Sequence, residues 1–131
     1  FKMYPPIRTE EDRLSLIDGL LSNVIDAIAT DHAPHPENTK TVDFKSAARG
    51  VVGLESAFPM LYSSGILSLE EIKRFMIENP RKILSEAGYE VKKSQINIWQ
   101  PCDKEFTTKS KFNNSIFEKR NTKIERVSQN V

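Results

Sequence analysis

A carboxylate and two imidazoles occur close together in the pentad Asp31-His32-Ala33-Pro34-His35. The pentad follows the short apolar run from Ile25 to Thr30, whose composition predicts a buried β-strand. Pro34 restricts the backbone of the turn that comes next. Because (β/α) barrels build their active sites from polar residues at the C-terminal ends of buried strands, the pentad is the candidate site.

Asp31 allows two interpretations. As a structural residue, an aspartate at a strand end can cap a turn through a hydrogen bond to nearby backbone. As a catalytic residue, it would bind a divalent metal and accept a proton from water that the metal activates. The surrounding pentad favours the second interpretation, which makes Asp31 both the candidate metal ligand and the candidate general base.

The chain has two histidines, and Pro34 lies between them. Because proline disfavours a helix here, we do not expect His32 and His35 to share a helix face as a zinc-binding pair. His35 could instead donate a hydrogen bond from the loop to an anionic group of a substrate. The alternative is an ordinary surface histidine in a polar loop.

Two arginines and two glycines are further candidates for binding a carboxylate. The guanidinium groups of Arg8 and Arg49 match the two oxygens of a carboxylate. Gly50 and Gly53 would let a small ligand approach main-chain N–H groups closely. Arg8 could equally pair with the acidic residues at 10–12, and Arg49 could simply lie on the surface.

The segments around the pentad predict a helix, then a strand, then a loop. Thr9 is a suitable N-cap, and the acidic residues at 10–12 suit a first helical turn. An apolar stripe at three- and four-residue steps follows, formed by Leu14, Ile17, Leu20 or Leu21, and Val24. The residues at 34–41 are typical of a long loop. This order is the repeating unit of α/β barrels.

Further helices are predicted at 54–62, at 69–77 behind a Ser68 and Glu71 capping box, and from Asn79-Pro80 to Gly88. After Gly88 the helical periodicity is lost. Candidate strands appear at 95–99 and 123–127, and the asparagines at 113, 114 and 121 are typical of turns.

Length, charge and cysteine content limit the function classes. With 131 residues, beginning at Phe1, the chain is shorter than the about 250 residues of a complete (β/α)8 barrel, and we expect a fragment. The net charge is −4 over residues 1–90 (10 basic, 14 acidic) and +5 over residues 91–131 (9 basic, 4 acidic). The sum of +1 predicts no nucleic-acid or membrane partner, although a basic RNA-binding tail is an alternative to a solvated surface. The single cysteine, Cys102, excludes an intrachain disulfide and fits a reducing, cytoplasmic location.

Together these residues resemble the C-terminal part of a type I dihydroorotase of the amidohydrolase superfamily. The resemblance rests on the pentad and on the segments Lys2-Met3-Tyr4-Pro5-Pro6-Ile7-Arg8 and Gly50-Val51-Val52-Gly53-Leu54-Glu55. It implies an α/β fold in which residues 1–88 form the C-terminal segment of a (β/α)8 TIM-type metal-dependent hydrolase barrel. Residues 89–131 would then be strands of a small β-sandwich domain.

The resemblance also implies an activity and roles for single residues. The parent protein would interconvert N-carbamoyl-L-aspartate and L-dihydroorotate in pyrimidine synthesis, with zinc as cofactor. Asp31 would be a zinc ligand and the general base and acid, His35 would contact the substrate carboxylate, and Arg49 with Gly50 would offer main-chain contacts. Tyr4 stands where the family often has a substrate-binding asparagine.

The family's His-x-His-x-Arg motif, its bridging lysine or aspartate and its two further metal histidines have no counterpart in this sequence. Since catalytic zinc takes about three protein ligands, the others are expected in the N-terminal remainder of the same protein. The chain alone is therefore expected to be inactive.

Two alternatives stay open. The parent could be another cyclic amidohydrolase, such as a hydantoinase or allantoinase, although Ala33 and His35 favour dihydroorotase. It could instead be an inactive dihydroorotase-like scaffold that supports aspartate transcarbamoylase. The expected partners are a small-molecule substrate and the N-terminal remainder, with a homodimer and aspartate transcarbamoylase as further candidates.

Overall fold

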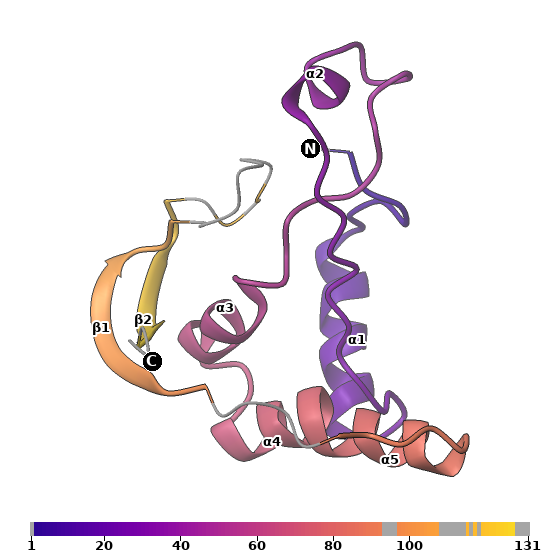
Figure 1. Ribbon diagram of the computed structural model, residues 1–131, viewed down its shortest axis with the longest axis vertical. Helices are drawn as coiled ribbons and strands as arrows, with labels where there is room; N and C mark the ends of the chain where they lie inside the picture. The colour runs from indigo at the N-terminus through magenta and orange to yellow at the C-terminus, as the bar shows by residue number, and fades with distance from the viewer. Residues whose placement is uncertain (1, 93–96, 108–114, 116, 118, 128–131) are drawn as a thin grey trace.

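The computed structural model describes residues 2–92, 97–107, 115, 117 and 119–127. Figure 1 shows an open arrangement in which helices α4 and α5 run across the foot of α1, while α3 and a two-stranded sheet lie to one side. The elements are α1 (Glu10–Leu21), α2 (Glu37–Lys40), α3 (Ala57–Ser64), α4 (Leu69–Lys73), the π-helix η1 (Arg74–Glu78), α5 (Asn79–Glu86), β1 (Trp99–Glu105) and β2 (Asn121–Arg126). The chain is thus a small α/β unit.

Helix α1 begins at the predicted N-cap. The Thr9 hydroxyl accepts a hydrogen bond of 3.2 Å from the Asp12 N–H, and the Asp12 carboxylate accepts one of 3.0 Å from the Thr9 N–H. This reciprocal capping box satisfies two N–H groups that a helix start otherwise leaves unpaired. The prediction of a helix after Thr9 is therefore confirmed.

The apolar stripe of α1 is only partly covered. Ile17 and Leu20 are half-buried, and Leu20 packs against the hydrophobic core. Leu14 and Leu21 are 53% and 47% exposed, and Val24, just beyond the helix, is 77% exposed. Within the described residues, one edge of the stripe is therefore left largely uncovered.

The prediction of a buried strand at Ile25–Thr30 is wrong. These residues run beside α1 without regular secondary structure, and they are half-buried or exposed (Figure 1). A strand needs neighbours to take its backbone hydrogen bonds. In this region the described residues provide one isolated parallel bridge, between His32 and Val51. The predicted loop at 34–41 also differs, because it contains the short helix α2.

Helices α4, η1 and α5 form one nearly continuous rod whose middle turn is widened. In the π-turn the Asn79 N–H bonds to the Arg74 carbonyl, so the next carbonyl, that of Phe75, would pair with residue 80. Residue 80 is a proline and has no N–H. The Phe75 carbonyl instead accepts the Ile28 N–H at 3.0 Å, which fixes the segment before the pentad against the rod.

The core lies where α1, α3 and this rod meet. Leu67, Ile72 and Phe75 are buried in it. Half-buried apolar residues that pack against them are Leu20, Ile28, Phe58, Leu61 and Met76. The predicted capping box of Ser68 and Glu71 is present and places Ile72 in this core. The prediction of a helix from Leu69 to Ile77 is thus confirmed in position, and its last residues are π-helical.

Helix α3 joins the core to the sheet. It begins at Ala57, three residues later than predicted, and ends at Ser64, where the C-cap residue Gly65 has a φ of 66° that suits glycine. The Phe58 ring meets the Trp99 ring edge-on at 4.8 Å between centroids. Ser63 Oγ accepts the Lys123 N–H of β2 at 2.8 Å.

The antiparallel pair of β1 and β2 differs from the predicted strands. The strand predicted at 95–99 is misplaced, because β1 begins at Trp99, the last predicted residue, and runs to Glu105. Residues 95 and 96 lie outside the described residues. The strand predicted at 123–127 corresponds to β2, and Asn121 begins that strand instead of marking a turn. Asn113 and Asn114 lie outside the described residues. None of the described helices has the length and apolar character needed to cross a bilayer.

Candidate active site

Asp31 directly follows the segment 25–30, which hydrogen bonds hold against the rod formed by α4, η1 and α5. Besides the bond from Ile28 to Phe75, the Asn79 side chain donates to the Asp26 carbonyl at 2.8 Å. Asp31 itself has φ of 43°, a left-handed conformation that aspartate tolerates better than most residues. Its side chain is exposed, and within the described residues it forms no hydrogen bond or ion pair. The structure therefore leaves this carboxylate accessible.

His32 holds the start of the segment that leads to α3. Its Nδ1 atom accepts hydrogen bonds from the N–H groups of Gly53, at 3.2 Å, and Leu54, at 3.1 Å. Because both partners are donors, Nδ1 carries no proton and the ring proton lies on Nε2. This role was not predicted. The two hydrogen bonds come from main-chain N–H groups twenty-one and twenty-two residues away, and no pattern of residue types in the sequence indicates them.

His35, Arg49 and Tyr4 lie together. His35 Nε2 lies 2.7 Å from the Arg49 carbonyl oxygen. The Arg49 guanidinium lies over the Tyr4 ring at 4.9 Å from its centroid, a cation–π contact. Three of the residues predicted to bind substrate thus come from distant parts of the sequence to one place.

Gly50 is tightly enclosed beside them. Its φ is 110°, and a Cβ added here would lie 2.4 Å from the Ala33 Cβ. Its N–H bonds to the Lys2 carbonyl at 2.9 Å, and the Ala33 N–H bonds to the Val51 carbonyl at 3.0 Å. Glycine is therefore required here by both conformation and space. The segment that carries Arg49 and Gly50 packs directly on the pentad.

Lys40 is a second residue that the sequence did not reveal. Its Nζ atom donates to the carbonyls of Ala48, at 2.7 Å, and Gly50, at 2.8 Å, and lies 3.5 Å from the Lys2 carbonyl. Burial, together with the nearby Lys2 ammonium, lowers the pKa of Lys40. The same segment therefore receives side-chain donors from both His35 and Lys40.

Arg8, the other predicted arginine, does not join this group. Among the described residues it forms no ion pair, and two of its three predicted acidic neighbours interact elsewhere: Glu10 pairs with Arg13, and Asp12 caps α1. No cluster of three or more His, Cys, Asp or Glu side chains suited to a metal occurs in the described part of the chain. Asp31 is also not joined to Tyr4, His35 or Arg49 by any hydrogen bond or ion pair there.

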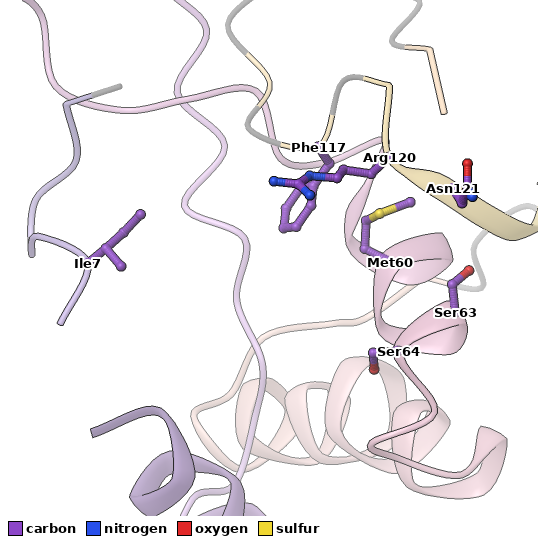
Figure 2. Close-up of a pocket in the computed structure, with 7 residues that line it drawn as sticks. All are labelled: Ile7, Met60, Ser63, Ser64, Phe117, Arg120 and Asn121. Carbon is purple, nitrogen blue, oxygen red and sulfur yellow. The ribbon is translucent and has the colours of Figure 1, made fainter. Parts of the chain in front are cut away.

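A hollow of about 600 Å³ lies elsewhere in the molecule. Figure 2 shows Met60, Ser63 and Ser64 of α3 and Phe117, Arg120 and Asn121 near β2 on one side, with Ile7 on the opposite wall. None of the predicted site residues lines this hollow. Its walls are largely apolar, and none of the lining side chains is a carboxylate or an imidazole, so we assign it no catalytic role.

Comparison with known proteins identifies relatives of this chain. No protein-family model matches it. Dihydroorotase of Ehrlichia chaffeensis is 40% identical over 134 aligned residues, which cover 93% of this chain and 30% of that protein. Dihydroorotase of Bacillus subtilis is 50% identical over 84 residues, covering 61% of this chain and 20% of that protein. Dihydroorotase of Bacillus thuringiensis is 48% identical over 93 residues, covering 67% and 22%.

The chain therefore spans between 20% and 30% of the length of these three relatives. The match to the Ehrlichia protein extends over nearly the whole chain, so it includes the pentad and the segment that packs on it. The chain is homologous to a segment of the dihydroorotases.

Proposed function

We propose that this chain is the C-terminal part of a zinc-dependent dihydroorotase that interconverts N-carbamoyl-L-aspartate and L-dihydroorotate. The observation that carries the proposal is the gathering of Tyr4, His35 and Arg49 beside the segment that follows Asp31, in a chain homologous to dihydroorotases. Residues 1–88 would complete a (β/α)8 barrel, and residues 89–131 would belong to its β-sandwich domain.

Arg49 and His35 are suited to hold the substrate carboxylate. A guanidinium can donate to both carboxylate oxygens at once, and the contact with the Tyr4 ring restrains the direction of this side chain. His35 donates from Nε2 to a carbonyl oxygen, which can only accept, so Nδ1 is the ring atom left for a ligand. His35 is proposed to contact the substrate carboxylate through Nδ1.

Asp31 is proposed to move the proton in the reaction. In the hydrolytic direction the ring amide bond of dihydroorotate breaks, and the leaving nitrogen needs a proton. An exposed carboxylate with no competing hydrogen bond in the described residues can accept a proton from the attacking water and deliver it to that nitrogen.

The residues of this chain do not by themselves make a zinc site. The described part offers Asp31 as one ligand where catalytic zinc takes about three protein ligands. We therefore propose that the remaining ligands come from the N-terminal remainder of the same protein. Zinc, when bound, would polarise the amide carbonyl of the substrate.

Other parts of the proposal concern partners and location. The uncovered stripe of α1 is proposed to pack on the N-terminal remainder. A homodimer and a complex with aspartate transcarbamoylase are further candidate assemblies, and the single cysteine fits a cytoplasmic protein.

The test uses the complete protein, loaded with zinc and assayed against dihydroorotate, hydantoin and allantoin. The proposal predicts turnover of dihydroorotate in preference to the other two. Preference for hydantoin or allantoin would assign a different cyclic amidohydrolase. Absence of any turnover together with binding to aspartate transcarbamoylase would identify a scaffold. Elemental analysis of the isolated 131-residue chain should find less than one zinc per chain, and two tightly held zinc ions would contradict the proposed division of ligands.

A further inference from the structure

Three consecutive main-chain carbonyls, those of residues 48–50, each accept a hydrogen bond from a side chain of the pentad or of α2. Lys40 Nζ donates to the carbonyls of Ala48 and Gly50 at 2.7 and 2.8 Å. His35 Nε2 donates to the Arg49 carbonyl between them at 2.7 Å. The main chain of the segment 48–50 is thus held on its carbonyl side by two residues.

The same segment is also held through its N–H groups. The Ala48 N–H bonds to the Thr39 carbonyl at 2.9 Å, and the Gly50 N–H bonds to the Lys2 carbonyl at 2.9 Å. Such a segment lies outside any helix or strand, so these contacts take the place of regular backbone pairing. Removing one side-chain donor would leave carbonyls unpaired and free the segment to move.

Lys40 is not placed to bind a ligand itself. An ammonium has three N–H donors, and the carbonyls of Ala48, Gly50 and Lys2 lie around it. The side chain is half-buried, whereas lysine is usually solvated. Its contacts are therefore directed at the main chain that carries Arg49.

We propose that Lys40 is a positioning residue of the dihydroorotase site, which holds the segment 48–50 so that the Arg49 side chain and the Gly50 backbone meet the substrate carboxylate. This inference rests on the proposed function. Lys40 would affect substrate binding by positioning Arg49, and it would take no part in metal binding or in proton transfer.

The kinetic test compares Lys40→Met, Lys40→Arg and Lys45→Met in the complete protein. Lys45 is an exposed lysine in the turn between α2 and the segment 48–50, and it serves as the matched control. Lys40→Met should raise KM for dihydroorotate about tenfold while kcat and zinc content stay near those of the wild type. Lys40→Arg, which keeps a donor, should recover part of this loss, and Lys45→Met should resemble the wild type. An unchanged KM, or parallel losses of kcat and zinc, would overturn the proposal.

A second readout does not depend on turnover. Trypsin cleaves after Arg49 and after Lys45, so a single digest of the native protein compares the held segment with its exposed neighbour. Lys40→Met should speed cleavage after Arg49 by about tenfold while cleavage after Lys45 changes little, because the segment opens locally. If the rate of cleavage after Arg49 is the same in the wild type and in Lys40→Met, the assignment of Lys40 is overturned, even if the protein hydrolyses dihydroorotate. Failure of the wild type to hydrolyse dihydroorotate would reject the proposed function, and the digest would still decide whether Lys40 holds the segment.

Discussion

The Nε2 atom of His35 lies 2.7 Å from the carbonyl oxygen of Arg49, fourteen residues further along the chain. The bond ties the end of the pentad to the segment that carries the candidate carboxylate-binding arginine. It also fixes which ring nitrogen faces that segment, since the carbonyl oxygen must receive a proton from Nε2. One histidine can thus serve both the main chain and a ligand, through different atoms.

Substitutions that imitate one ring nitrogen at a time separate these two roles. His35→Gln can still donate to the Arg49 carbonyl, because its amide nitrogen reaches about as far as Nε2. In the complete protein it should raise KM for dihydroorotate about tenfold, the effect of losing one hydrogen bond to a charged group. His35→Asn is too short to reach that carbonyl and should raise KM further. Zinc content should stay at the wild-type level in both, and a matching loss of zinc would instead make His35 a metal ligand.

Gly50→Ala should destabilise the complete protein more than Gly65→Ala does. Both glycines have positive φ, but a Cβ at Gly50 would lie 2.4 Å from the Ala33 Cβ, whereas a Cβ at Gly65 meets nothing within 4 Å. The backbone cost is also larger at Gly50, because its φ of 110° lies outside the left-handed region that Gly65 occupies with φ of 66°, so the free energies of unfolding should differ by about 1–3 kcal/mol. Urea unfolding of the two variants measures this difference. Equal destabilisation would show that Ala33 and Gly50 are not in this close contact.

The capping box before α4 predicts a dependence of stability on pH. The pKa of Glu71 is lowered, first by the Ser68 N–H, then by the Ser68 hydroxyl and by Arg74. A carboxyl whose pKa is lower in the folded protein stabilises it above its unfolded pKa, near 4.5, and loses this effect as pH falls through the folded value. Glu71→Gln keeps an acceptor oxygen but removes the charge, so its melting temperature should be below that of the wild type at neutral pH and should approach it in acid.

Thermal melts of the complete protein at neutral pH and near pH 3 test this prediction. Glu70→Gln is the control, because it removes a charge from the same helical turn and leaves the cap intact. A gap between the wild type and Glu71→Gln that is the same at both pH values would contradict the proposed contribution of the cap.

The isolated chain should not behave as a stable monomer. Leu14, Leu21 and Val24 are 53%, 47% and 77% exposed, and the segment at 25–30 lacks strand partners in the described residues. Exposed apolar surface and unpaired backbone favour association. Size-exclusion chromatography with mass spectrometry should find self-association, or a second polypeptide bound to the chain. A monodisperse 14.9 kDa monomer would contradict the proposed packing of α1 on another part of the protein.

Local signals in the sequence predicted local structure correctly. The capping residues Thr9 and Ser68 act over three positions, and both helices begin where these residues indicate. The apolar run at 25–30 has the composition of a strand, but a strand also needs partners, and composition does not supply them. The start of β1 was misplaced for a similar reason, because its limits depend on pairing with β2 across an antiparallel register that contains an irregularity beside Pro101.

The candidate site was predictable only in part. The residue types at Asp31, His35, Arg49 and Gly50 led to the proposed chemistry, and the close approach of Gly50 to Ala33 gives a physical reason for a glycine there. The roles of His32 and Lys40 could not be read from the sequence, because their partners are main-chain N–H and carbonyl groups that every residue possesses. Side chains that hold backbone leave no pattern of residue types to recognise.

The central claim is that Asp31 transfers the proton in a dihydroorotase, and Asp31→Asn tests it most directly. Asparagine tolerates the φ of 43° at this position about as well as aspartate, so the backbone should be kept while the ionisable group is lost. The steady-state rate of dihydroorotate hydrolysis is measured for the wild type and the variant as complete, zinc-loaded proteins with matched thermal stability. We predict that kcat falls by about 10²–10⁴-fold, the usual contribution of a general acid and base. A zinc-loaded Asp31→Asn protein that hydrolyses dihydroorotate at nearly the wild-type rate would contradict the account.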